Sequence, residues 1–208
     1  MTNTPQQKTP WPKYETDTLD GRRQRSERSR KQIIEAMFDL MREGDLRPSA
    51  TDVADRAGVG LRTVFRHFED MDSIFEEMTE DLKKIVMPMV FAPYEATCWR
   101  DQLMELVDRE ARIYELVFPM QVGLLARRSG SEFLQRQYAY EVGLVRSTLQ
   151  SILPDAVIAD KTLFAAIEVN HTFATWHRLR EDQDLTVEVA TETIKRIMAA
   201  LIADIDVE

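Results

Sequence analysis

The chain has 208 residues, and 44% of them are apolar, which is enough for a buried core in one or two domains. No apolar run approaches the roughly 18 residues of a membrane-spanning helix, so we expect no membrane contact. The first residues contain no apolar stretch of signal-peptide type, and we therefore expect a cytoplasmic protein. Cys98 is the only cysteine, which excludes an intrachain disulfide and a cysteine-based zinc site.

The net charge of −9 is distributed unevenly along the chain. Residues 21–68 hold 11 Lys/Arg and 7 Asp/Glu, a net charge of +4, whereas residues 69–208 hold 14 and 26, a net charge of −12. An acidic body repels nucleic acid, but a basic segment attached to it attracts phosphate. The asymmetry therefore indicates nucleic-acid contact by one part of the chain only.

The N-terminal segment 1–21 is rich in proline and polar residues, which predicts a disordered tail. A helical pattern begins at Arg22. Its apolar residues share one helix face and end just before Gly44, which suits a left-handed C-terminal cap. The residues of this apolar face are Ile33, Ile34, Met37, Phe38 and Met41.

The segment 49–68 has the pattern of two short helices joined by a tight turn. Ser49, followed three residues later by Asp52, predicts the N-cap of the first of these helices. Gly58-Val59-Gly60 ends it, and a turn of this length with glycine lets the next helix leave at a steep angle, as in a helix-turn-helix. The apolar residues that would hold the second helix to its support are Leu61, Val64 and Phe68.

The remainder of the chain is also predicted to be helical. Pro88 and Pro119 are expected to end helices, because proline lacks the amide hydrogen. The sequence has no sustained alternation of apolar and polar residues and no hairpin turn between strand-like segments. We therefore predict an all-α fold of about nine helices. The predicted helices beyond the first three cover residues 71–88, 100–117, 119–128, 131–152, 160–180 and 186–204.

The polar side of the second short helix suits the DNA major groove, which is about one helix wide. Arg62 and Arg66 can donate hydrogen bonds to phosphate or guanine, and Thr63 can bond a base edge or contact a thymine methyl group. His67 can donate to a phosphate. Phe65 is a large apolar group on the side expected to be exposed, where it serves no core.

Residues 28–80 resemble the DNA-binding part of the TetR family of transcriptional regulators. The resemblance is carried by the amphipathic first helix, by the pattern D-V-A-x-x-A-G-V-G-x-x-T-V-F-R-H-F that ends at Phe68, and by Ile74-Phe75. It implies a three-helix helix-turn-helix domain followed by a helical domain for effector binding and dimerisation. The implied domains are residues 22–70 for DNA binding and residues 71–208 for the second domain, with a connecting helix at 71–88.

The resemblance also implies roles for single residues. Residues 61–63 match the base-reading start of the recognition helix, Thr51 matches a position that can reach bases, and Ser49 caps its helix and can contact phosphate. Phe65 and His67 match an aromatic residue and a histidine that commonly contact the DNA backbone. At the position of Phe65 the family usually has Tyr, and Phe lacks the hydroxyl that would bond a phosphate. The predicted DNA-binding residues are Ser49, Thr51, Leu61, Arg62, Thr63, Phe65, Arg66, His67, Arg22, Arg23 and Arg25.

The chain departs from the family pattern near the start of the helix after the motif. The family tends to have Lys there, whereas this chain has Glu69, Asp70 and Asp72, whose carboxylates would repel DNA. A basic run in the first helix is expected to compensate by reaching the DNA backbone or minor groove, and a solvated helix face is the alternative. This run is Arg22, Arg23, Arg25, Arg28, Arg30 and Lys31.

One helix-turn-helix covers only a few base pairs, so we expect a homodimer on the two half-sites of a double-stranded operator. The resemblance places the dimer contact in the last two long helices, with internal core packing as the alternative. The helices between residues 100 and 180 are expected to enclose a pocket for a small, largely apolar effector that releases a repressor. The predicted ligand-binding residues, for each of which core packing is the alternative, are Trp99, Tyr114, Phe118, Phe133, Tyr138, His171, Trp176 and His177.

An all-α enzyme and a protein-binding adaptor are the rival hypotheses. Glu168-x-x-His171 has the spacing of half a di-iron site, but the sequence has no second Glu-x-x-His. It also has no Walker loop, G-x-S-x-G or H-E-x-x-H motif. We therefore predict no catalytic residues, no metal and no cofactor. An adaptor would not need the exposed basic side of the second short helix, which favours the regulator.

Overall fold

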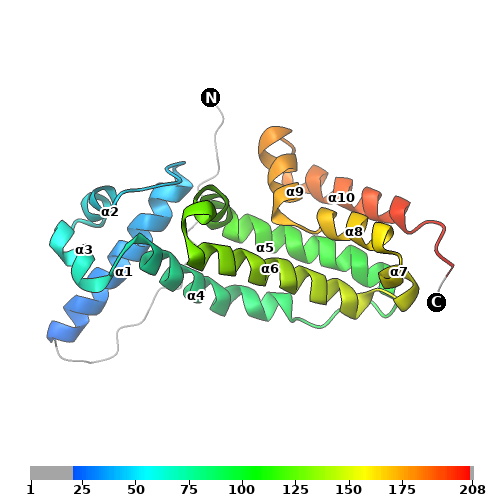
Figure 1. The fold of residues 1–208 in the computed structure, drawn as a ribbon, viewed down its shortest axis with the longest axis horizontal. Coiled ribbons are helices and arrows are strands. Elements are labelled where there is room, and N and C mark those ends of the chain that lie inside the picture. Colours follow the sequence, from blue (N-terminus) through cyan, green and yellow to red (C-terminus); the bar gives the residue numbers. More distant parts are fainter. Residues whose placement is uncertain (1–20, 207–208) are drawn as a thin grey trace.

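The computed structural model describes residues 21–206 (Figure 1). Within this range the chain forms ten α-helices, a short 3-10 helix and a short π-helix, and no strand. The all-α prediction is therefore confirmed, with one α-helix more than expected. The predicted tail lies outside the described residues except for Gly21, the first residue of α1. None of the described helices is both long and apolar enough to cross a membrane.

The first three helices form a small unit at one end of the molecule (Figure 1), which we call the head. They are α1 (Gly21–Arg42), α2 (Ala50–Ala57) and α3 (Leu61–His67). The Ser49 hydroxyl accepts a hydrogen bond from the Asp52 amide at 3.2 Å, and the Asp52 carboxylate accepts one from the Ser49 amide at 2.9 Å, so the predicted N-cap is a complete capping box. Gly58 ends α2 in the left-handed region, with φ of 66°.

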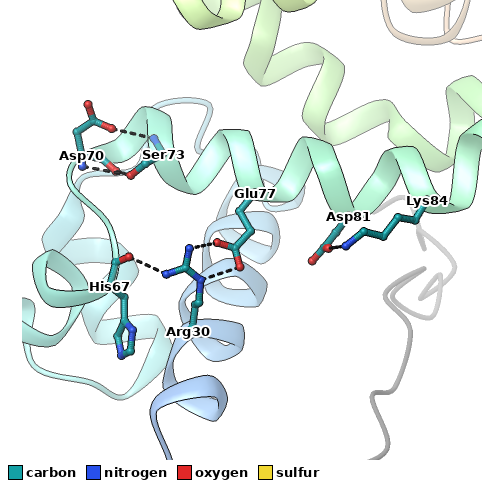
Figure 2. Close-up of polar contacts among 7 residues, drawn as sticks. All are labelled: Arg30, His67, Asp70, Ser73, Glu77, Asp81 and Lys84. Carbon is teal, nitrogen blue, oxygen red and sulfur yellow. Dashed lines mark hydrogen bonds and ion pairs between the residues drawn. The ribbon is translucent and has the colours of Figure 1, made fainter. Parts of the chain in front are cut away.

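A long helix, α4 (Met71–Val90), leads from the head along the rest of the molecule (Figure 1). Asp70 is its N-cap and accepts a hydrogen bond from the Ser73 amide at 2.8 Å (Figure 2). Pro88 lies inside α4, so the prediction that this helix stops there was wrong by two residues. A proline in the last turn removes a single intrahelical bond, and packing of the apolar face outweighs that loss.

The segment predicted as two helices, 100–117 and 119–128, is one helix, α5 (Trp99–Arg127), with Pro119 inside it. The expected break at Pro119 was wrong. The helix continues because Val117, Met120 and Leu124 lie on one buried face on both sides of the proline. Burial of this continuous stripe compensates for the hydrogen bond that the proline cannot make.

The predicted helix 131–152 is confirmed as α6 (Glu132–Ile152), which packs beside α5 in the centre of Figure 1. The prediction of a single helix over 160–180 was wrong, because α8 ends at Asn170 and a new helix begins at Phe173. Thr172 caps a new helix by accepting a hydrogen bond from the Thr175 amide, and the Tyr114 hydroxyl donates to the His171 carbonyl at 2.6 Å. The segments after α6 are α7 (Asp155–Ala159), α8 (Lys161–Asn170), α9 (Phe173–His177), a π-helix (Arg178–Asp182) and α10 (Val187–Leu201).

Two apolar cores hold these helices together. The first joins the head to α4 and to the second half of α5, and the second fills the space between the first half of α5 and helices α6 to α10. The head contacts α5 closely at Gly123, where a Cβ atom would overlap the Met41 side chain. The head is therefore packed against the rest of the chain rather than attached by a linker.

Candidate functional sites

The exposed side of α3 is the candidate nucleic-acid interface. Val64 and Phe68 are buried and fix the helix to the head, as the sequence predicts. Phe65 is 52% exposed, and Arg62 and Arg66 are exposed as well. Leu61 is 43% exposed and faces solvent, so the prediction that it holds the helix to its support was wrong. Thr63 is partly buried on the same short helix.

The start of α2 also reaches the surface of the head. Thr51 and Ser49 are both exposed. The Ser49 hydroxyl donates to the Asp52 carboxylate at 2.5 Å, and this bond, with the Ser49 amide, holds the pKa of Asp52 below its usual value. The Ser49 hydroxyl hydrogen is thus engaged in the cap. In this arrangement the hydroxyl does not have its hydrogen available to donate to a phosphate.

His67 lies at the end of α3 and is only partly exposed. Its Nε2 atom is enclosed without a hydrogen-bond partner among the described residues. Burial and the positive charges of Arg66 and Arg30 lower the pKa of His67, so the ring is neutral at neutral pH. A phosphate contact by this ring would be a neutral hydrogen bond rather than an ion pair.

Arg30 does not belong to the DNA-facing part of the basic run, because its guanidinium points into the head (Figure 2). Its Nε donates to Glu77 Oε1 at 2.8 Å, and its Nη1 donates to the His67 carbonyl at 2.8 Å. Its Nη2 also pairs with Glu77, and the guanidinium lies 4.5 Å from the centre of the Phe68 ring. Arg30 therefore ties α1 to the end of α3 and to α4.

The other basic residues of α1 have different environments. Arg23 is 68% exposed and pairs with Glu27 one turn later at 3.4 Å. Arg25 is exposed on the same helix. The side chain of Arg22 lies outside the described residues. The prediction that these three reach DNA stays a prediction.

Two of the three carboxylates expected to repel DNA have structural partners. Asp70 caps α4: its carboxylate accepts a hydrogen bond from the Ser73 amide at 2.8 Å, and its own amide donates to the Ser73 hydroxyl at 3.2 Å (Figure 2). Asp72 lies 3.7 Å from the Arg127 guanidinium at the end of α5. Glu69 remains exposed. Asp70 thus serves the start of α4, and Asp72 serves the contact of α4 with α5.

The candidate effector site is a cavity of about 170 Å³ between α4, α5 and α6, closed by the start of α9. Tyr114 and Tyr138, two of the predicted ligand residues, are on its wall. Apolar side chains make up most of the remaining wall. They include Leu82, Val86, Ile113, Val117 and Val145.

The other predicted ligand residues are not on the wall of this cavity. The Phe118 ring stacks on His177, with ring centres 5.7 Å apart. The Trp176 indole donates to Glu115 at 2.9 Å. Phe133 packs against the core that contains the head, and Trp99 lies under the Arg100 guanidinium.

His171 is fully buried, but its partner is Glu110 rather than Glu168. Its Nδ1 lies 2.6 Å from Glu110 Oε2, and its Nε2 has no partner among the described residues. Glu168 instead accepts two hydrogen bonds from Arg146. The half-site Glu168-x-x-His171 is therefore not formed.

Sequence reasoning missed two carboxylates of the cavity, Glu110 on α5 and Glu141 on α6. A signal for Glu141 was present, because it lies three residues after Tyr138 and four before Val145 on the same helix face. A carboxylate on an apolar face is the informative exception in such a stripe. Burial raises the pKa values of Glu110 and Glu141, and burial, together with the charges of these two carboxylates, raises the pKa of Tyr114.

Comparisons with known proteins bear on the fold as a whole. No protein-family model matches the chain, and no curated protein matches its sequence. Among solved structures, a transcriptional regulator from Rhodococcus sp. Rha1 superposes with a TM-score of 0.66 and 15% identity, covering 88% of this chain and 98% of its own. A Rhodococcus sp. protein assigned to the TetR family of transcriptional regulators gives 0.61 and 16%, covering 84% and 98%.

The chain has the TetR-family fold. A Clostridium perfringens protein named as a fatty acid metabolism regulator shares it, with a TM-score of 0.59 and 14% identity over 85% of this chain and 100% of its own. The resemblance predicted from residues 28–80 is thus confirmed at the level of the fold, and it extends to the helices beyond α4 that carry no motif. The division into a DNA-binding domain at 22–70 and an effector and dimer domain at 71–208 stays a prediction.

Proposed function

We propose that the chain is a DNA-binding transcriptional regulator that binds a duplex with two half-sites as a homodimer. The observation that carries the proposal is the composition of the exposed side of α3. Arg62, Phe65 and Arg66 are exposed there, while Val64 anchors the opposite side. Neither arginine has an ion-pair partner within the described range, so both guanidinium groups are available for phosphate or base edges.

The dimer is proposed to form through α8 and α10. Val169 on α8 is 57% exposed and Val189 on α10 is 49% exposed, so both helices expose large apolar side chains in the monomer. A second chain would cover them. In sedimentation we expect a dimer for the natural chain and a monomer for Val169→Glu. Phe91→Glu, which changes an apolar residue outside these helices that is 69% exposed, should remain dimeric; a monomeric natural chain would contradict the proposal.

We further propose that the chain is a repressor that an effector releases. The effector would occupy the cavity between α4, α5 and α6, and α4 connects this cavity to the head. An effector that binds one arrangement of the two heads better than the other shifts the population toward it. The spacing of the heads then no longer matches the two half-sites.

The central experiment replaces Thr63 and Arg66 together by alanine. We expect sequence-specific DNA binding to be lost and the melting temperature to stay close to that of the natural chain, because Arg66 is exposed and Thr63 is only partly buried. Arg136→Ala is the matched control, since Arg136 is 71% exposed on α6, and it should bind DNA normally. A double variant that binds the same duplex with unchanged affinity would refute the proposal.

The salt dependence of binding is an independent readout. Each phosphate contact contributes about 0.9 to the slope of log affinity against log salt. A dimer that engages several phosphates should therefore lose affinity steeply as salt rises. A flat response would favour the protein-binding adaptor.

A further inference from the structure

We propose that the cavity between α4, α5 and α6 binds an organic cation, a protonated or quaternary amine on a small apolar group, with Glu141 as its counter-charge. The inference rests on the proposed function only in treating this cavity as the effector site. Its physical basis is a carboxylate that the described part of the protein orients but does not neutralise.

Glu141 lies on the cavity wall and is held by two neutral donors. The Gln137 amide donates to its Oε1 at 2.7 Å, and the Gln121 amide donates to its Oε2 at 3.0 Å. Both oxygens are thus fixed in place, from α6 and from α5. Amide donors reduce the cost of burying a carboxylate but leave its charge in full.

The two cationic residues beside the cavity have other partners. The Lys83 ammonium donates to Glu80 at 2.8 Å, although its charge still lowers the pKa of Glu141 somewhat. The Arg109 guanidinium contacts Glu105 at 3.3 Å and donates to two backbone carbonyls of the α4–α5 connection. Each cation is therefore paired with a carboxylate of its own, and the charge of Glu141 remains in excess.

The second carboxylate of the cavity differs from the first. Glu110 has the His171 Nδ1 atom at 2.6 Å, so its carboxylate already has a hydrogen-bond partner. Both carboxylates line the cavity together with Tyr114. A positive ligand group entering there meets Glu141, whose hydrogen-bond donors are both neutral amides, whereas an anionic group meets two carboxylates.

The wall also limits the size and the apolar part of the ligand. For comparison, an apolar protein cavity of about 150 Å³ accepts benzene, and this one has a volume of about 170 Å³. Tyr138 and Tyr140 add aromatic surface on the α6 side. Each ring already has a cation of the protein over it, Arg128 at 4.0 Å from the Tyr138 ring centre and Lys83 at 5.2 Å from that of Tyr140, so Glu141 supplies the counter-charge for the ligand. The geometry therefore suits one ring or a short branched chain with a positive end.

The test uses three probes of nearly the same shape on the full chain: 2-phenylethylamine, which is a cation at neutral pH, neutral 2-phenylethanol and anionic phenylacetate. We expect calorimetry to show binding of the amine at least about tenfold tighter than of the alcohol, with the acid weakest. Glu141→Gln should bring the amine to the affinity of the alcohol. Glu132→Gln is the matched control on α6, where Glu132 is 92% exposed, and should change nothing.

Three results would overturn the inference: equal or tighter binding of the alcohol or the acid, no binding of the amine, or unchanged amine binding by a folded Glu141→Gln variant. If that variant does not fold, the order of the three probes on the natural chain still decides. Binding of DNA is measured separately. A chain that binds DNA but not the amine refutes this inference alone, and one that binds the amine but no DNA refutes the proposed function alone.

Discussion

The position of α3 depends on Arg30, and replacing Arg30 by methionine tests this dependence. Methionine keeps the apolar stem and removes the guanidinium. The change deletes the hydrogen bonds to Glu77 and to the His67 carbonyl, together with the contact on the Phe68 ring. The end of α3 would then lose its polar link to α1 and α4.

The magnitude follows from the exposure of the groups. Arg30 is 43% exposed and Glu77 is 28% exposed, so solvent screens the ion pair, and its contribution falls to about 1 kcal/mol or less. The bond to the His67 carbonyl adds about 1 kcal/mol. We therefore expect Arg30→Met to lower the free energy of unfolding by about 1 to 2 kcal/mol in urea titrations.

The same variant separates a positioning role from a DNA contact. We expect Arg30→Met to weaken DNA binding while leaving the salt slope unchanged, because Arg30 touches no phosphate. Arg23→Met, at an arginine that is 68% exposed, should leave stability within about 0.5 kcal/mol. If Arg23 touches phosphate as predicted, its loss reduces the salt slope by about 0.9. An Arg30→Met protein of natural stability with a reduced slope would refute the reasoning.

Three further changes have defined outcomes. Gly123→Val puts side-chain atoms against the flexible end of Met41 and the Phe75 ring, and should cost about 1 to 3 kcal/mol in urea unfolding; stability equal to the natural chain in both this variant and Gly123→Leu would show that the head does not pack on α5 as described. Ser49→Ala removes the capping box with Asp52 and should cost about 1 kcal/mol, with Ser49→Thr as the milder control. Burial raises the pKa of Glu141 above its value in the unfolded chain, so its contribution to stability is full below pH 4.5 and is lost as pH rises through the folded value. Urea titrations should therefore show stability falling over that window in the natural chain and less so in Glu141→Gln; identical pH profiles would contradict the burial of the carboxylate.

The head was predictable because its signals are local. The capping box of Ser49 and Asp52, the left-handed Gly58 and the apolar positions Val64 and Phe68 all lie within twenty residues of one another. Each is a property of the backbone or of one helix face, so neighbouring residues decide it. The same holds for α6, whose single apolar face specifies its length.

Contacts between distant segments decided the features that the sequence did not show. The helix break at His171 depends on the Tyr114 hydroxyl, 57 residues earlier, which donates a hydrogen bond to the His171 carbonyl. Pro119 remains in a helix because partners on other helices bury both sides of it. Arg30 points inward because Glu77 meets it from α4, 47 residues away. Spacing along one segment carries no information about such partners.

The direct test of the central claim is selection of bound sequences from random duplex DNA, with the number of chains per duplex counted on the product. The account predicts an enriched, dyad-symmetric sequence with half-sites about one DNA turn, or a multiple of it, apart, and two or a multiple of two chains on it. Selection that enriches no sequence, or a single asymmetric site holding one chain, would contradict the assignment of α3 as a reading helix.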